Sequence, residues 1–435
     1  MRVVLDVGVT DRQFVLNLRD RFDILCTGHV VPSAQPSVLD MEVTTGAPDP
    51  VDDARWYRFP MVVVRFLRTG TDDVLLTEHI RFVNYSTGAN RADLVNALAL
   101  GLAKLAGTGG LDVQSVRVTA VIDPAQSGRT QHPAMSILLK RLKGLFVYEQ
   151  WNCGIGRLEE ADLKAGGPLA LPQHMHWLPW PRVRTFNADP FVVDIDGIPW
   201  ILYEYIDSRE KGEIRARSWD GRRWGDEISL LVGDGHYSYP CIFRHGGEIF
   251  VLPEGSASGR TVLYRLATDT MRLVEHAVLF EDKGIIDPTI VHRDGYWWLW
   301  GGIPGLQENA SVFLWYATAP HGPWVSHPSS PLSLDVRSSR PGGSVWEQGG
   351  MLYRPAQDSS RGYGCAVAIH RIDRLTPEHY AETPVGTMPP AANWKQPAGF
   401  HTLSRDGQWV VVDALRNRYS LWLPFARIFE RIIGR

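Results

Sequence analysis

The sequence predicts a mainly β protein: a five-bladed β-propeller preceded by a small α/β domain. Three observations predict this fold class. The 435 residues include 41 glycines and 29 prolines, which indicate many turns. Tryptophan (16) outnumbers both phenylalanine (15) and tyrosine (14), a balance that favours a sugar-handling β architecture over a helical one. The second half also repeats one pattern five times: an apolar run, a DG or GG turn, and a second apolar run.

The five repeated segments share two markers that recur at similar intervals along the chain. A proline opens each segment, a glycine marks its turn, and both recur every 48 to 57 residues. The DG and GG dipeptides supply the positive φ values that two-residue hairpin turns need. A hairpin at this period, with further strands between, is typical of a propeller with four strands per blade, whereas a sandwich would require coincidental spacing. The markers are Pro190, Pro240, Pro288, Pro341 and Pro397, with Gly197, Gly247, Gly295, Gly350 and Gly407.

The propeller is predicted to cover residues 145–423. Closing a ring of blades requires one more strand, and residues 146–156 are its expected source. Residues 424–435 predict a C-terminal amphipathic helix, with apolar side chains on one side and arginines interspersed. Docking of this helix on its own domain is the favoured interpretation, and peripheral contact with an anionic membrane surface is the alternative.

Residues 1–140 predict a small α/β domain of unassigned role. Residues 9–22 and 90–107 have helical apolar spacing, and the second of these segments stops at a glycine. Residues 1–7, 60–67, 78–85 and 115–123 read as strands, and residues 133–145 as a short helix leading into the propeller. The region contains no phosphate-binding glycine loop, so no nucleotide is expected.

Composition excludes several classes of function. The formal net charge is −3, too low for broad nucleic-acid binding, and no run of about eighteen apolar residues predicts a membrane-spanning helix. Asp6 and Asp11 interrupt any secretion signal, and the four cysteines are scattered without metal or disulfide spacing. We therefore expect a cytoplasmic protein. Location at the inner face of the membrane is a further expectation.

Propeller geometry gathers polar residues at one mouth of the central channel. The inner strands begin there, and the second strands of the hairpins end there. Carboxylates, an arginine, a histidine and aromatic rings at one mouth would make a saccharide site, because aromatic faces stack on sugars and paired carboxylates suit glycosidic chemistry. These residues are Asp189, Tyr239, Asp287, Arg340 and His401 on the inner strands, and Glu204, Glu254, Trp300, Asp358 and Asp413 on the second strands.

Several motifs carry a family resemblance. The ADPF and IDPT openings, each followed by a DG hairpin, and the GPW…PL stretch at 316–332 resemble the five-bladed propellers of glycoside hydrolase family 43. The ordered set EQWNCGI, ADPF, SYPCIF, VLPE, IDPTI and RPAQDSSRGYG more closely resembles the propeller domain of glucosamine inositolphosphorylceramide transferases and their bacterial relatives. The resemblance covers about residues 145–420.

This resemblance implies catalytic roles. Asp189 matches the carboxylate that acts as general base, and Asp287 matches the one that orients the acid and tunes its pKa. The acid itself should open the fourth inner strand, where this sequence has Arg340. Glu254 is therefore expected to serve as the replacement acid, with Glu204 as second choice. A raised-pKa carboxylic acid is what leaving-group protonation needs.

Two arginines favour an anionic ligand. Arg340 and Arg354 at the mouth would bind a carboxylate or phosphate through paired N–H groups, as in a uronic acid or a lipid-linked glycan. Asp358 would bind substrate, or it would have a structural role by bonding to Arg354 and holding the loop. His401 stands where related propellers supply a histidine to a calcium site, so calcium is the only metal expected, on weak grounds.

The predicted function is a carbohydrate-active enzyme, a glycosidase or glycosyltransferase. It would cleave or transfer a glycosyl unit of an anionic or lipid-linked glycan in intracellular assembly of cell-surface glycans, with a saccharide or glycolipid as partner. The alternative is a non-catalytic glycan-binding module that positions substrate for a partner enzyme, which the missing fourth-strand glutamate favours. A third hypothesis gives the chemistry to residues 1–140, which show no catalytic motif.

Overall fold

The computed structural model describes most of the second half of the chain and parts of the first. The described residues are 2–7, 12–27, 40–43, 50, 54, 61–71, 73–82, 87–107, 115–127, 142, 145–159, 171–172, 174–182, 185–207, 211–233, 235–394 and 398–420. The predicted helix at 424–435 lies outside them, as does most of the one predicted at 133–145.

The N-terminal region forms one mixed sheet with helices against it. The strand order is β2-β1-β5-β3-β4, with β1 parallel to β2 and β5, and β3 antiparallel to β4 and β5. Both predicted helices are present, and they bury apolar side chains at helical spacing, as in Leu94, Leu98 and Leu102. The elements are β1 (Arg2–Asp6), α1 (Arg12–Thr27), β2 (Asp40–Val43), β3 (Met61–Arg68), β4 (Val74–Arg81), α3 (Thr87–Gly107), β5 (Ser115–Ile122) and α4 (Pro124–Ser127).

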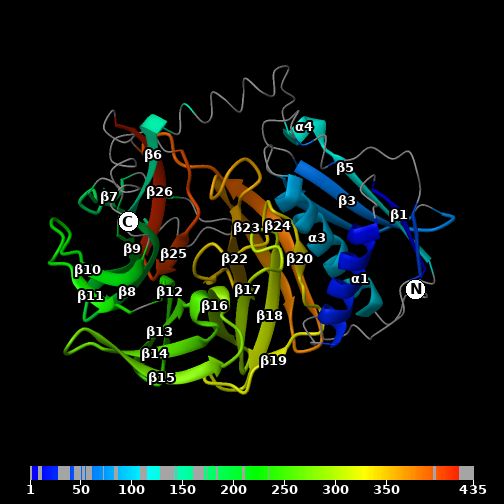
Figure 1. Cartoon of the computed structure of the whole chain (residues 1–435). Coiled ribbons are helices and arrows are strands. Elements are labelled where there is room, and N and C mark those ends of the chain that lie inside the picture. The colour runs from blue at the N-terminus through cyan, green and yellow to red at the C-terminus, as the bar shows by residue number, and fades with distance from the viewer. Residues whose placement is uncertain are drawn as a thin grey trace.

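Five antiparallel sheets follow along the chain, so the prediction of a mainly β fold is confirmed (Figure 1). The first holds β8 (Phe186–Ile195), β9 (Ile198–Ile206), β10 (Gly212–Ser218) and β11 (Ile228–Leu231). The second holds β12 (Ser238–His245), β13 (Glu248–Glu254), β14 (Thr261–Ala267) and β15 (Arg272–Phe280), with the 3₁₀ turn η2 (Ser256–Ser258). The third holds β16 (Ile286–Arg293), β17 (Tyr296–Gly302), β18 (Ser311–Ala317), β19 (Val325–Ser326) and β20 (Ser333–Leu334).

The last two sheets differ in how they are assembled. The fourth holds β21 (Trp346–Gln348), β22 (Met351–Asp358), β23 (Ala366–Leu375) and β24 (Tyr380–Met388). The fifth joins β25 (Leu403–Asp406) and β26 (Trp409–Tyr419) to β6 (Val147–Arg157) and β7 (His176–Trp177). Strand β6 pairs with β26 along its whole length, so the strand predicted at 146–156 does join the last sheet.

The predicted turns join the first two strands of these sheets. Asp196 (φ 53°) and Gly197 (φ 82°) both adopt the left-handed conformation that a type I′ hairpin turn requires. Glycine pairs or Asp–Gly pairs fill the same position in the other hairpins. The turns therefore fix the pairing register of the two strands that each of them joins.

The N-terminal region packs on the third sheet. The Lys104 ammonium in α3 donates hydrogen bonds to the carbonyls of Pro331 (2.5 Å) and Leu332 (3.1 Å) beside β20. The Arg21 guanidinium in α1 donates to the carbonyl of Gly305 at 2.7 Å. One hydrophobic cluster runs through both parts, and Figure 1 shows α1 and α3 beside this sheet. Within the described residues, no helix is both long enough and apolar enough to cross a membrane.

Candidate functional site

A cavity of about 200 Å³ lies where the strands of different sheets converge. It is lined by side chains from strands of three of the five sheets and from the loops between strands, and these include acidic, basic and aromatic residues. The lining residues are Trp151, Phe186, Ala188, Asp189, Glu204, Ile206, His236, Ser238, Glu254, Arg340, Tyr363 and His401. Five residues that the sequence places at the mouth line this cavity together: Asp189, Glu204, Glu254, Arg340 and His401.

Three inner strands open on a residue in an unusual backbone conformation. Asp189, Tyr239 and Asp287 each precede a proline and have φ values of 50°, 48° and 46°. Non-glycine residues adopt the left-handed region at a cost, and such strain gathers at functional sites. The pairing register shifts at each of these positions.

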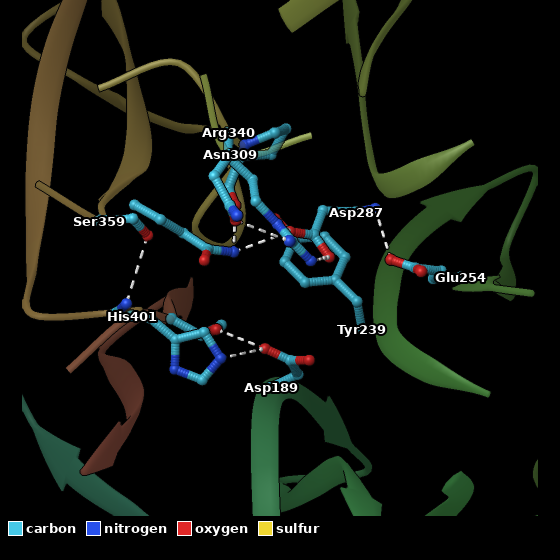
Figure 2. Close-up of polar contacts among 12 residues, drawn as sticks. Asp189, Tyr239, Glu254, Asp287, Asn309, Arg340, Ser359 and His401 are labelled. Atoms are coloured by element: carbon cyan, nitrogen blue, oxygen red, sulfur yellow. Dashed lines mark hydrogen bonds and ion pairs between the residues drawn. The ribbon is translucent and has the colours of Figure 1, made fainter. Parts of the chain in front are cut away.

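Carboxylates from neighbouring strands hold two of these residues in place. The Asp189 amide donates to Asp413 Oδ2 at 3.2 Å, and the Asp287 amide donates to Glu254 Oε2 at 2.9 Å (Figure 2). Asp413 also accepts the amides of His401 (2.9 Å) and Thr402 (3.1 Å). The strained backbone is thus fixed by buried acidic side chains.

His401 lies between two carboxylates. Its Nε2 is 3.1 Å from Asp189 Oδ1, and its Nδ1 is 2.8 Å from Asp413 Oδ2. Burial alone would lower the pKa of His401, but the carboxylates of Asp413 and Asp189 outweigh it and raise this pKa to about 10. The pKa of Asp189 is lowered: burial acts against this, but the charge and hydrogen bond of His401 overcome it. Both groups are therefore charged at neutral pH.

Asp287 and Arg340 form a second buried pair. Arg340 Nε is 2.6 Å from Asp287 Oδ2, and its Nη2 is 3.4 Å from Oδ1 (Figure 2). Arg340 Nη1 donates to Asn309 Oδ1 at 3.1 Å, and Gln357 Nε2 donates to Asp287 Oδ2 at 2.7 Å. Three of the five guanidinium N–H groups are thus bound within the protein, and the main partner of Arg340 is Asp287, whereas the sequence predicts an anionic ligand.

Two glutamates on the cavity wall are poised to exchange protons. Burial raises the pKa of Glu204 to about 7, with a further contribution from Asp189, while His236 (Nε2–Oε1 2.8 Å) acts in the opposite direction. Burial likewise raises the pKa of Glu254 to about 7, helped by Asp287 and opposed by Arg340. A carboxylic acid with such a pKa can donate a proton at neutral pH.

Aromatic rings cover His401 on the cavity side. The Trp151 ring centroid lies 4.3 Å from the imidazole centroid, and that of Tyr363 lies 5.2 Å away. The guanidinium carbon of Arg340 lies 5.5 Å from the Tyr363 ring centre. Trp151 and Tyr363 both line the cavity, so an aromatic wall faces the acidic one.

Four predicted binding residues lie elsewhere. Trp300 is fully buried between the third and fourth sheets, next to Tyr380. Arg354 is fully buried too, with its Nη2 2.7 Å from Glu382 Oε1. Tyr239 lies beneath the cavity, where its hydroxyl contacts Thr289 and Gly343. The placement of Trp300 and Arg354 at the mouth is corrected, because alternate residues of a strand point to opposite faces.

Asp358 does not line the cavity either, and its side-chain contact fits the structural alternative of holding the loop. It accepts the amide of Ser360 at 2.9 Å and holds the loop after β22. The residue before it, Gln357, points to the centre instead and binds Asp287. Counting from the turn glycine would have found it, because Glu204, Glu254 and Gln357 follow Gly197, Gly247 and Gly350 by the same seven positions. In the third repeat that position is Gly302, not Trp300.

The expected calcium site does not fit these residues. Asp189, His401 and Asp413 have ligand atoms within 4.8 Å of one another, the one such group found among the described residues. Both ring nitrogens of His401 face carboxylate oxygens, and Asp413 accepts three backbone amides. Calcium takes six to eight oxygen ligands, but the carboxylate oxygens of this group are already engaged by His401 and by backbone amides. The protonated imidazole of His401 therefore supplies the positive charge at this position.

The His401 ring is expected to stay protonated far above neutral pH. Its folded-state pKa of about 10 exceeds the ordinary value of 6.5, so its contribution to stability is complete below pH 6.5 and is lost as the pH rises through about 10. Two-dimensional NMR of the imidazole C–H groups between pH 5 and 10 measures this. Asp413→Asn should move the titration to lower pH, and a wild-type midpoint near 6.5 would contradict the assignment.

The fold and this cavity define a protein of tandem antiparallel sheets with an acidic, aromatic-walled centre. The family model "Glucosamine inositolphosphorylceramide transferase 1, N-terminal" matches residues 180–398, half of the chain. The chain belongs to this family, which confirms the resemblance drawn from its motifs.

Relatives with curated names share this region. The glucosamine inositolphosphorylceramide transferase 1 of Oryza sativa subsp. japonica is 35% identical over 210 residues, covering 46% of this chain and 28% of the relative. That of Arabidopsis thaliana is 32% identical over 213 residues, covering 46% and 27%. The chain thus spans less than a third of the length of these relatives.

Solved structures show weaker likeness. A thermostable family-43 glycoside hydrolase matches with 17% identity over 50% of this chain and 78% of the other, at a TM-score of 0.35. A GH43_1 enzyme from Xanthomonas citri in complex with xylotriose matches with 13% identity over 54% and 87%, at a TM-score of 0.39.

Proposed function

We propose that this protein is a carbohydrate-active enzyme that cleaves or transfers a single glycosyl unit bound in the central cavity. In this proposal the five sheets are the blades of a propeller and the cavity is its mouth. One observation carries it: an ionised aspartate and two glutamates with pKa values near 7 line the same small cavity. A volume of about 200 Å³ is below the ~300–1,000 Å³ of sites for drug-sized ligands and suits one sugar ring.

Asp189 is the proposed general base. Thr402 and His401 hold its Oδ1 at 2.7 and 3.1 Å and keep it ionised. It would take the proton from the attacking water or sugar hydroxyl, whose oxygen then forms a bond to the anomeric carbon. The backbone strain at Asp189 and the Asp413 contact fix its direction, as a positioned base requires.

Glu254 is the proposed general acid. In its protonated form it would give its proton to the glycosidic oxygen as the bond from that oxygen to the anomeric carbon breaks. Asp287 is the positioning residue: its amide donates to Glu254 Oε2, and its charge raises the pKa of Glu254. Arg340 anchors Asp287 in turn. Arg340, at the position where the resemblance implies the general acid, would thus hold Asp287 in place.

The wider setting is part of the proposal. The names of the relatives refer to glucosamine and to inositolphosphorylceramide, which supports a glycan carried on a lipid phosphate as the substrate. With Arg340 bound to Asp287, the phosphate would lie outside the cavity. The cytoplasmic face of a membrane is the proposed location. In agreement, Cys153, Cys241 and Cys365 are free thiols.

The alternative is a binding module without turnover. Arg340 stands at the position where the resemblance implies the general acid, and it is bound to Asp287. This favours the binding module, because an arginine cannot serve as that acid. Incubation of the purified chain with panels of oligosaccharides, nucleotide sugars and glycolipids, read by mass spectrometry, separates the two. The enzyme predicts products that differ by one sugar unit. Binding without any product selects the module, and neither binding nor product contradicts both.

A further inference from the structure

Two segments far apart in the sequence meet where β6 begins and β26 ends. These strands pair side by side, and the Ser420 amide donates to the Phe146 carbonyl at 2.8 Å (Figure 1). Trp151 of β6 lines the central cavity, and the pairing continues past it for four residue pairs, to Val147 and Tyr419. This end of the two strands therefore lies at the rim of the cavity.

Large apolar side chains are exposed at this end of the strands or next to it. Five of them are more than a third exposed: Leu142 (46%), Leu145 (42%), Phe146 (40%), Trp180 (37%) and Tyr419 (75%). Leu142, Leu145 and Phe146 have helical backbone conformation, and their i, i+3, i+4 spacing places them on one helix face. Exposed apolar side chains gathered at one place indicate a surface that meets a partner.

Arginines are interspersed with these side chains. The Arg416 guanidinium carbon lies 3.1 Å from the centre of the Trp180 ring, and Arg416 Nη2 donates to Gln150 Oε1 at 3.2 Å. Gln150 Nε2 donates to the carbonyl of the exposed Arg182 at 3.2 Å. Arg418 is two positions from Arg416 on β26, so both side chains lie on one face of the sheet. Together these residues form the rim surface, made of residues 142, 145–146, 180–182 and 416–419.

The chain that leads to the rim surface and the chain that leaves it are both basic. Residues 133–146 include two lysines and one arginine and no acidic residue, and residues 420–435 include three arginines and one glutamate. The formal net charge of the whole chain is −3, so these two segments differ from the rest. The hydrogen bond between Ser420 and Phe146 brings the ends of both segments together. Positive charge is thus concentrated around the exposed apolar side chains.

We infer that the rim surface docks on an anionic lipid bilayer and thereby holds the mouth of the central cavity beside the membrane. Indole and phenol rings favour the headgroup level of a bilayer, and arginines are attracted to its anionic headgroups. Aromatic rings and arginines also occur at protein interfaces, but basic residues among apolar ones in both adjoining segments are typical of a membrane surface. The inference does not rest on the chemistry proposed for the cavity, and it gives the proposed location a definite surface and orientation.

Sedimentation of the full chain with lipid vesicles tests this inference. The probes are vesicles of phosphatidylcholine alone and of phosphatidylcholine mixed with phosphatidylserine, each at low and at high salt. We expect at least about tenfold tighter binding to the vesicles that contain phosphatidylserine, since each arginine near an anionic surface contributes about fivefold. Salt should weaken this binding, because it screens the attraction between the arginines and the headgroups.

The double change of Arg416→Gln with Arg418→Gln is the informative variant. It should weaken binding to the anionic vesicles by at least about tenfold, because it removes two charges from the rim surface. The matched control is Arg222→Gln with Arg223→Gln, which changes two exposed arginines after β10, at the end of the first sheet away from the cavity. This control should bind as the wild type does. Thermal unfolding shows whether each variant is folded, and Arg418→Glu at an exposed position is the second test if the double variant is not.

The outcomes decide between a bilayer and other occupants of the rim surface. If neither kind of vesicle binds, a protein partner or a second copy of the chain covers this surface, and the inference fails. Equal binding to both kinds of vesicle contradicts the role of the arginines, and unchanged binding of the double variant places the contact elsewhere; each overturns the inference. Vesicle binding requires no turnover, so its failure leaves the proposed function standing, and absence of turnover leaves this inference standing.

Discussion

Replacing Asp287 by Ala is expected to lower the free energy of unfolding by about 3–5 kcal/mol, the cost of leaving a buried charge without its partner. The Arg340 guanidinium is bound by Asp287 at 2.6 Å, and the Asp287 side chain is only 2% exposed. The change also removes the acceptor for Gln357. Urea unfolding of the wild-type protein and the variant measures the difference.

A double-mutant cycle separates the ion pair from general damage. Arg340→Leu in the Asp287→Ala background removes the unpaired charge, so the double variant should be more stable than the sum of the single changes predicts. As a matched control, Asp282→Ala changes an exposed surface carboxylate and should cost less than about 0.5 kcal/mol. A loss below about 1 kcal/mol for Asp287→Ala would show that the pair does not hold the centre together.

Glu254→Gln is expected to reduce turnover of a glycan substrate by about 10²–10⁴-fold. The amide oxygen of glutamine can still accept the Asp287 amide, so the strand opening should keep its shape, but no proton is available for the leaving oxygen. Wild-type turnover should fall as the pH rises through about 7, because Glu254 loses its proton there, and this decline should be absent from the residual activity of the variant.

Two comparisons make the acid assignment specific. Asp189→Asn should also reduce turnover by orders of magnitude, but through loss of the base. Glu254 is intact in this variant, so its residual activity should still decline as the pH rises through about 7. Glu275→Gln on the surface should leave turnover and its pH profile unchanged. Full activity of Glu254→Gln would mean that Glu204, or a residue outside this cavity, supplies the proton.

The turn signals make the fold largely predictable. The DG or GG dipeptide of each of the five repeats lies in a hairpin whose strands the sequence indicates, and the pairing of β6 with β26 is the join that the expected extra strand requires. On the second strands of the first two sheets, the site residues are predictable by counting seven positions from the turn glycine. Glu204 and Glu254 obey this count, whereas Trp300 is two positions short and lies in an interior cluster.

Other features of the site depend on contacts across the chain. Arg340 lies 53 positions from Asp287, and His401 lies 212 positions from Asp189, so no local pattern reveals that these cations are already paired. The sequence predicts the carboxylates of the mouth but assigns Arg340 to an anionic ligand, and only the folded structure shows this guanidinium paired with Asp287. The partner of each charge decides the sign of the site.

The most direct test of the central claim is the indole N–H spectrum of the protein during titration with a monosaccharide. Trp151 lines the cavity, and Trp300 is fully buried between two sheets. A sugar bound at the centre should shift the Trp151 signal in a saturable way and leave Trp300 in place. Saturable binding that leaves Trp151 unmoved, or that moves Trp300 equally, would contradict a carbohydrate site at the convergence of the five sheets.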